Sequence, residues 1–153
     1  MISVDFYILP DEQTISLQQY ACKLAEKNWL SGKRVLIQTD SSEDSQQIDD
    51  LLWNISADSF IPHGIATLEP VDQEQPILIS HQKINDINFQ HIINLSSRPS
   101  DVMESNDSTI NELKIDEILN QNEQRKQCGR ALYKIYREHG YTLEHHTLET
   151  HNG

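Results

Sequence analysis

The fold class is decided by residues 4–39, whose sequence is VDFYILPDEQTISLQQYACKLAEKNWLSGKRVLIQT. Residues 4–9 are rich in β-forming side chains, and residues 35–39 form a short apolar run typical of a strand covered on both faces. Between them, apolar residues recur at helical spacing, and Gly32 is placed to end that helix. Such a strand–helix–strand unit almost always joins parallel strands by a right-handed crossover, so the sequence predicts a parallel α/β sheet.

The alternation of strands and helices continues along the chain. Residues 41–53 predict a second helix, residues 76–79 and 91–95 two further strands, and residues 121–139 a final helix that ends at Gly140. Residues 110–119 fit neither period cleanly, and we interpret 113–118 as a strand. The expected architecture is a three-layer, Rossmann-like sandwich with a mostly parallel central sheet. It forms one domain over residues 1–144, followed by a C-terminal tail of residues 145–153.

Length and charge limit the function. A chain of 153 residues is the size of one domain, and its net charge of -12 gives a field that repels DNA, RNA and anionic lipid. We therefore expect no specific binding to DNA and no membrane partner. The chain has no apolar run of about 20 residues and no secretory signal at its start, which predicts a cytoplasmic protein.

The motifs of common α/β enzymes are missing. None of the five glycines builds a phosphate-binding loop, so we expect no nucleotide cofactor. Cys22 and Cys128 lie far apart, and no nucleophile elbow is present. His145, His146 and His151 lie close together near the C-terminus, where a solvated tail is favoured over a metal site. We therefore predict no metal and no cofactor.

Two aspartates keep an enzymatic alternative open. Asp5 in the first strand and Asp40 after the second could lie at the carboxyl edge of the sheet, where receiver-like domains collect acidic metal ligands. On that hypothesis the chain is a small metal-dependent phosphatase or receiver-like domain. Capping and solvation explain both residues more simply, and this explanation is favoured.

A local concentration of positive charge stands out in this acidic chain. Five of its twelve basic residues are Arg125, Lys126, Arg130, Lys134 and Arg137. Arg130, Lys134 and Arg137 follow a spacing of i, i+4 and i+7, so they share one face of the last helix, with Tyr133 beside them. Such a face is either a solvated surface or a site for a short acidic peptide, which binds guanidinium and ammonium groups. Stacking of single-stranded nucleic acid on Tyr133 and Tyr136 is a less favoured alternative.

A second candidate surface combines apolar residues near the end of the second helix. Trp53 is followed by Phe60, Ile61 and Pro62, which is more apolar surface than a connector normally carries. The two rings either close the core or form a hydrophobic hot spot for a partner.

These residues resemble the chi subunit family of bacterial DNA polymerase III. The resemblance covers nearly the whole chain, and the order and spacing of its pieces make it specific. The pieces are Phe6-Tyr7, Lys23-Leu24-Ala25-Glu26 to Trp29, Ser31-Gly32-Lys33-Arg34-Val35-Leu36-Ile37, Leu52-Trp53, Ser59-Phe60-Ile61-Pro62-His63, and Leu132-Tyr133-Lys134-Ile135-Tyr136-Arg137 with Gly140.

The resemblance implies a non-catalytic adaptor of the clamp-loader complex in DNA replication, which links the psi subunit to single-stranded DNA-binding protein. In the family, the acidic C-terminal tail of the latter docks on a basic, aromatic patch. By the matching motif this patch falls on Arg130, Tyr133, Lys134 and Arg137, with Leu119 nearby. The psi-binding surface falls on Trp53, Phe60 and Pro62, where a repair helicase is a possible competitor.

Overall fold

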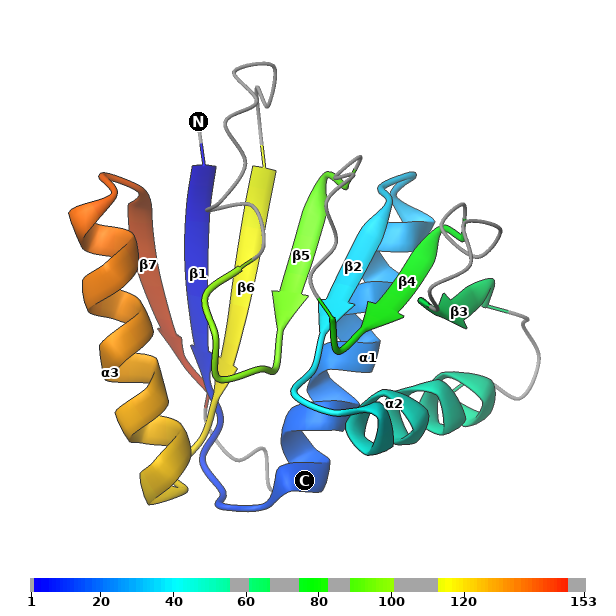
Figure 1. Ribbon diagram of the computed structural model, residues 1–153, viewed down its shortest axis with the longest axis horizontal. Coiled ribbons are helices and arrows are strands. Elements are labelled where there is room, and N and C mark those ends of the chain that lie inside the picture. Colours follow the sequence, from blue (N-terminus) through cyan, green and yellow to red (C-terminus); the bar gives the residue numbers. More distant parts are fainter. Residues whose placement is uncertain (1, 56–60, 67–74, 83–88, 101–112, 149–153) are drawn as a thin grey trace.

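The computed structural model describes residues 2–55, 61–66, 75–82, 89–100 and 113–148. Over these residues the chain forms one seven-stranded sheet with three helices (Figure 1). The strands are β1 (Ile2–Ile8), β2 (Val35–Gln38), β3 (His63–Ile65), β4 (Ile77–Ser80), β5 (His91–Asn94), β6 (Leu113–Leu119) and β7 (Thr142–Thr147), and the helices are α1 (Thr14–Leu30), α2 (Ser42–Asn54) and α3 (Glu123–Glu138). The strand order is β3-β4-β2-β5-β6-β1-β7, with every pairing parallel. The predicted α/β fold is confirmed.

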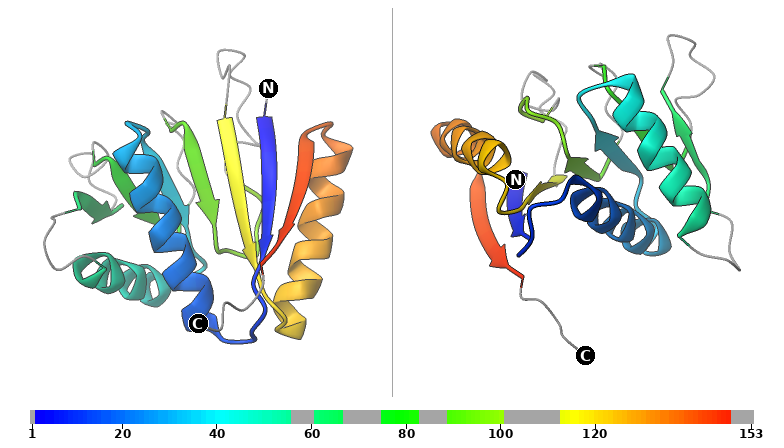
Figure 2. Two further views of the ribbon diagram at one scale, coloured as in Figure 1. Left: turned by 180° about the vertical axis from the view of Figure 1, so that it is seen from behind. Right: turned by 90° about the horizontal axis from the view of Figure 1, so that it is seen from below.

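The helices cover the two faces of the sheet and make three layers (Figure 2). Helices α1 and α2 pack on one face, where Ala21, Ile48 and Ile37 belong to one buried cluster. Helix α3 packs on the other face, where Leu132 and Phe6 belong to a second cluster. Successive side chains of a strand point to opposite faces, which is why β2, β4 and β5 each contribute to both clusters.

Local sequence explains most of the helix ends and the central strands. All four residues of β2, β4 and β5 are buried, as expected for strands covered on both faces. The Ser41 hydroxyl accepts a hydrogen bond from the Asp44 N–H at 3.1 Å and caps α2. Gly32 and Gly140 follow α1 and α3 with φ of 83° and 76°, a left-handed conformation that favours glycine and stops a helix.

The interpretation of residues 113–118 as a strand is confirmed, because they lie in β6, which pairs with both β1 and β5. Two other segments differ from the expectation from the sequence. Strand β3 lies in a segment that the sequence pattern did not mark as a strand, because three residues are too few to show a period. His145 and His146 lie inside β7, so these two residues belong to the sheet and not to the predicted tail.

Phe60, which was predicted for the second surface, lies outside the described residues, as does most of the connection between β5 and β6, residues 101–112.

Among the described helices, none combines the length and apolar character needed to cross a bilayer.

Candidate functional site

A pocket of about 420 Å³ lies where the first half of α3 passes over the carboxyl ends of β1 and β6. It is open to solvent on one side. Its lining comes from three strands, the turn after β6 and one helix: Phe6, Ile8, Leu119, Asn120, Gln121, Lys126, Gly129, Arg130, Tyr133 and His145. The volume falls within the range of small-ligand sites, and several of the lining side chains are apolar. Of the residues proposed from the sequence, this pocket brings together Leu119, Arg130 and Tyr133.

The pocket depends on a close approach between α3 and β6. A Cβ atom added at Gly129 would lie 2.5 Å from Cδ1 and 2.9 Å from Cδ2 of Leu119. Real Cβ atoms do not approach other atoms so closely, so only glycine permits this helix position while Leu119 keeps its rotamer. Gly129 is buried in the interior of the helix, where glycine costs helix stability. Close packing explains its presence, and the sequence reasoning missed it.

We predict that Gly129→Ala narrows the pocket with little change in stability. The added methyl group forces Leu119 to rotate, and the pocket is the open space beside it. The gain in helix propensity, about 1 kcal/mol, offsets much of the strain. The free energy of unfolding, measured with urea, should therefore change by less than about 1 kcal/mol, while occupancy of the pocket by a ligand falls. The double variant Gly129→Ala with Leu119→Ala removes the clash, and an equally large loss of ligand binding there would contradict this explanation.

Three rings form one wall of the pocket. The ring of Tyr133 lies 5.5 Å from that of Phe6 and stacks on the imidazole of His145 at 5.0 Å. Phe6 and His145 also stack on each other, with centroids 5.7 Å apart. These contacts hold the half-buried Tyr133 ring in place, so a ligand meets a preformed aromatic surface. Phe6 and His145 were not proposed as site residues.

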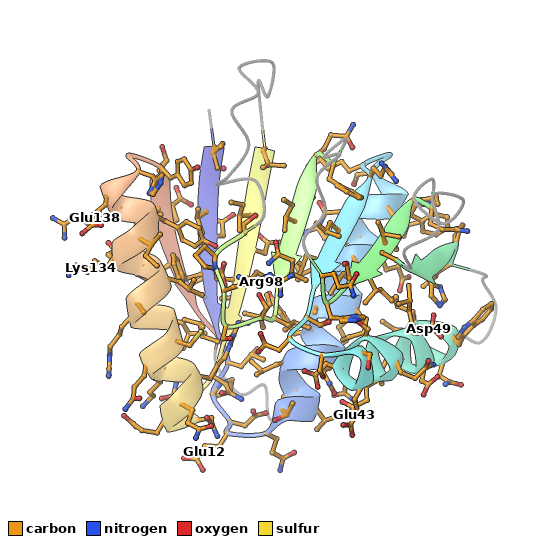
Figure 3. The ribbon with its side chains drawn as sticks, in the orientation of Figure 1. Glu12, Glu43, Asp49, Arg98, Lys134 and Glu138 are labelled. Carbon is orange, nitrogen blue, oxygen red and sulfur yellow. The ribbon has the colours of Figure 1, made fainter. Side chains whose placement is uncertain are left out.

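The basic residues of α3 divide into two groups. Lys126 and Arg130 line the pocket. Lys134 and Arg137 are exposed and lie outside it, and Lys134 points away from the sheet on the outer side of α3 (Figure 3). The face that meets the pocket therefore carries residues 126, 129, 130 and 133, which also follow helical spacing. Lys126 belongs to the predicted basic run but was not assigned to the site.

Arg125 belongs to the same basic run, but its side chain binds backbone oxygens of the fold. Its guanidinium donates hydrogen bonds to the backbone oxygens of Ile118 and Ser96 at 2.9 Å and of Asn94 at 3.2 Å. These bonds tie the start of α3 to the ends of β5 and β6. Arg125 is therefore an anchor of the helix that carries the pocket, with its donors directed inward.

Tyr136 and Glu117 form a buried polar link on the inner side of α3. The Tyr136 hydroxyl donates to Glu117 Oε1 at 2.6 Å and accepts from the Ser100 N–H at 2.9 Å. Asn94 Nδ2 donates to the same carboxylate oxygen at 2.8 Å. Tyr136 is fully buried, so it offers no exposed ring for a nucleic-acid base to stack on. Stacking of single-stranded nucleic acid was considered on Tyr133 and Tyr136, and only Tyr133 of these two rings is accessible.

Glu117 is a fully buried carboxyl group, with a pKa raised to about 7. Burial is the main cause, because the ionised form loses its hydration. The nearby Arg125 guanidinium and the hydrogen bonds from Tyr136 and Asn94 favour ionisation and limit the shift. The fold therefore binds a proton at this position more tightly than the unfolded chain does.

The second predicted surface is formed in part by described residues. Trp53 lies at the end of α2 and is 55% exposed, with its ring packed edge-on against His63 at 4.8 Å. Pro62 precedes β3 and is half-buried, whereas Ile61 is buried in the core and is not part of the surface. The site and this surface lie at opposite ends of the sheet, near β7 and β3 respectively (Figure 1).

The structure separates the two aspartates of the enzymatic alternative. Asp5 lies in the middle of β1 and Asp40 follows β2, with β5 and β6 between those strands. Asp40 accepts hydrogen bonds from the backbone and side chain of Ser97. Burial raises the pKa of Asp5, but hydrogen bonds from Lys114 and His146 outweigh it, and the pKa lies below its usual value. The two carboxylates do not form one acidic site.

Together the fold and the pocket define a class: a parallel α/β domain with a ligand-sized pocket that has an aromatic wall and two cations at its edge. The chain belongs to the DNA polymerase III chi subunit family. The family model described as "DNA polymerase III chi subunit, HolC" matches residues 1–144.

Three relatives, each named DNA polymerase III subunit chi, support this assignment. The protein from Pseudomonas aeruginosa is 29% identical over 148 residues, covering 97% of this chain and 98% of the relative. The Escherichia coli protein is 28% identical over 147 residues, covering 94% and 96%. The Haemophilus influenzae protein is 32% identical over 144 residues, covering 92% and 94%. Chi is an accessory subunit, so the family places the chain in DNA replication and gives it no catalytic activity of its own.

A similar fold occurs in a solved structure with another name. The crystal structure of T4 UvsW matches with a TM-score of 0.61 and 10% sequence identity, over 97% of this chain and 42% of that one. At this identity the likeness concerns the fold alone.

Proposed function

We propose that this chain is an adaptor of the polymerase III clamp-loader complex that bridges the psi subunit and the acidic C-terminal tail of single-stranded DNA-binding protein. The tail occupies the pocket beside α3, and psi occupies the surface around Trp53. The proposal rests on the resemblance to the chi family for the identity of the partners. The geometry of the two surfaces supports it.

The chemistry of the pocket suits a short acidic peptide with an apolar end. Phe6, Leu119 and Tyr133 offer apolar and aromatic contacts for a terminal aromatic side chain. Lys126 and Arg130, at the same pocket, can bind carboxylates through charge-assisted hydrogen bonds. Because the rest of the chain is strongly acidic, a long polyanion would be repelled while a short tail can be accepted.

The observation that carries this proposal is the combination of Arg130 and Tyr133 at one preformed pocket. The test is a calorimetric titration of the full chain with an acidic peptide that ends in Pro-Phe, at two salt concentrations. We expect a dissociation constant in the range of about 1 to 100 μM that weakens as salt rises. Tyr133→Ala should abolish binding without unfolding the protein. Absence of binding to the folded, unsubstituted chain would refute the assignment of this pocket.

The position of the second surface favours simultaneous binding of two partners. The pocket lies beside α3 and β7, whereas Trp53 and Pro62 lie beside β3 at the other edge of the sheet. Lys134 and Arg137, which lie outside the pocket, extend the positive charge along α3 and contribute to attraction of the tail over a longer range. A repair helicase that uses the Trp53 surface would compete with psi and leave the pocket free.

We predict that Trp53→Ala weakens binding to psi at least tenfold, because an exposed tryptophan is a frequent hot spot of interfaces. The unfolding temperature should fall by only a few degrees, since the ring is half exposed. Leu30→Ala is the matched control, because Leu30 is also an exposed apolar side chain but belongs to α1. Co-purification with psi followed by titration measures both. Equal losses in the two variants would contradict the assignment.

A further inference from the structure

The face of β1 and β7 opposite the pocket carries a group of ionisable side chains, Asp5, Glu144 and His146. Asp5 pairs directly with Glu144 in the parallel register, and His146 lies two residues further along β7 on the same face. Phe6 and His145, their neighbours in sequence, point to the other face and contact Tyr133. This alternation makes the cluster independent of the pocket.

Three atoms of the cluster lie at the spacing of metal ligands. His146 Nε2 is 3.1 Å from Asp5 Oδ1 and 3.8 Å from Glu144 Oε2, and all three atoms lie within 4.8 Å of one another. Ligands of a tetrahedral zinc ion, at bonds of about 2.0 Å, are separated by about 3.3 Å. Within the described part of the chain, no other three histidine, cysteine, aspartate or glutamate side chains bring their ligand atoms this close together.

The surroundings hold two of the three groups in position. The imidazole of His146 stacks on the Tyr7 ring at 4.9 Å, and Tyr20 from α1 packs against the same tyrosine at 5.5 Å. Lys114 binds Asp5 through Oδ2 at 2.7 Å, so Oδ1 is the oxygen left toward His146. The Asp5 side chain is 6% exposed and its rotamer is held by these contacts. Preorganised ligands reduce the entropic cost of binding an ion.

The charge balance of the cluster favours a cation. Asp5 and Glu144 face each other across the two strands, and carboxylates in directly opposite positions repel. Asp116, buried in the neighbouring strand and paired with His91, adds a third acidic group. Lys114 offsets part of this charge through its ion pair with Asp5. A divalent ion bound beside the edge strand β7 would offset the remaining negative charge.

We propose that Asp5, Glu144 and His146 form a binding site for a divalent transition-metal ion of the zinc type, with solvent completing the coordination. One imidazole and two carboxylates are a donor set that zinc accepts, and the donors do not match the all-oxygen sites of magnesium. Because the ligands come from β1 and β7, the ion ties the edge strand to its neighbour. Its role is structural, and it is distinct from the peptide-binding pocket.

The test uses the full chain without an affinity tag, treated with chelator and titrated with Zn²⁺ by calorimetry. We expect one equivalent to bind and to raise the unfolding temperature, and we expect Co²⁺ to give the absorption bands of a low-coordinate site. His146→Ala should lower the affinity at least about tenfold. Glu144→Gln should also lower it, and this change in a side chain that is 67% exposed leaves the core untouched.

The matched control is His145→Ala, the adjacent histidine that points to the opposite face. This variant should bind Zn²⁺ like the unsubstituted chain, as should His151→Ala. Loss of binding in either control equal to that in His146→Ala would overturn the site. Absence of binding by the folded, unsubstituted chain up to about 1 mM Zn²⁺ would overturn it as well.

Discussion

Arg130→Glu is expected to weaken binding of the acidic peptide about 100-fold at about 0.1 M salt, because the change removes a charge-assisted hydrogen bond and places a repelling carboxylate at the pocket. Arg130 lines the pocket, so its guanidinium acts at short range where salt screens little. Calorimetric titration of the folded variant measures the effect. The unfolding temperature should stay close to that of the unsubstituted chain, since Arg130 is exposed.

Lys134→Glu provides a control with the same change in net charge on the same helix. Lys134 points away from the sheet and does not line the pocket (Figure 3). The substitution therefore acts on the peptide only through long-range electrostatic interaction, which salt screens. We expect the affinity for the peptide to fall by less than about fivefold. Equal losses in the two variants would show that general charge governs binding and that the pocket has no special role. A larger loss for Lys134→Glu would place the peptide on the outer face of α3.

The second large effect concerns stability and pH. The buried Glu117 has a pKa of about 7 in the folded chain against an ordinary value of 4.5. Its contribution to stability is therefore fully present below about pH 4.5 and is lost as the pH rises to about 7. Between pH 5 and pH 8 this single group lowers the free energy of unfolding by about 2 to 3 kcal/mol. Carboxylates with lowered pKa values, such as Asp5, act in the opposite direction at low pH.

Glu117→Gln isolates this contribution. The amide keeps an oxygen that can accept from Tyr136 and Asn94 but has no proton to lose in this range. Urea unfolding at pH 5, 6, 7 and 8 should show the variant gaining about 2 to 3 kcal/mol relative to the unsubstituted chain. Glu138→Gln is the control, because it removes an exposed carboxyl group from α3, the helix that carries Tyr136 (Figure 3). The free energy of unfolding of this control should change with pH in parallel with that of the unsubstituted chain. If the difference between Glu117→Gln and the unsubstituted chain does not change with pH, Glu117 is not the group that titrates.

Most of the fold was predictable because its signals are local. The helix over α1 shows its apolar spacing within seventeen residues, and Gly32 and Gly140 mark the ends of two helices. The short strands β2, β4 and β5 are apolar throughout because both of their faces are covered. One element was harder to predict. The period of β6 is obscured by buried polar residues such as Asp116 and Glu117, whose partners come from other elements.

The candidate site was predictable only in outline. The sequence places positive charge and Tyr133 on the last helix, but helical spacing permits two neighbouring faces, one with Lys134 and Arg137 and one with Lys126 and Gly129. Both faces contain Arg130. Which of them meets the sheet depends on the rotation of α3, and that rotation is fixed by contacts of Arg125, Gly129 and Tyr136 with distant strands.

The sequence by itself therefore determined the alternation of strands and helices, the absence of a glycine-rich phosphate loop and the location of the basic run. These properties follow from the period and chemistry of residues that are close in the chain. Only the tertiary structure decided that Leu119, Phe6 and His145 meet beside α3, and that Asp5 lies beside His146, which is 141 residues away. Such contacts arise from strand order and register, which depend on burial of the whole sheet and leave no local pattern in the sequence.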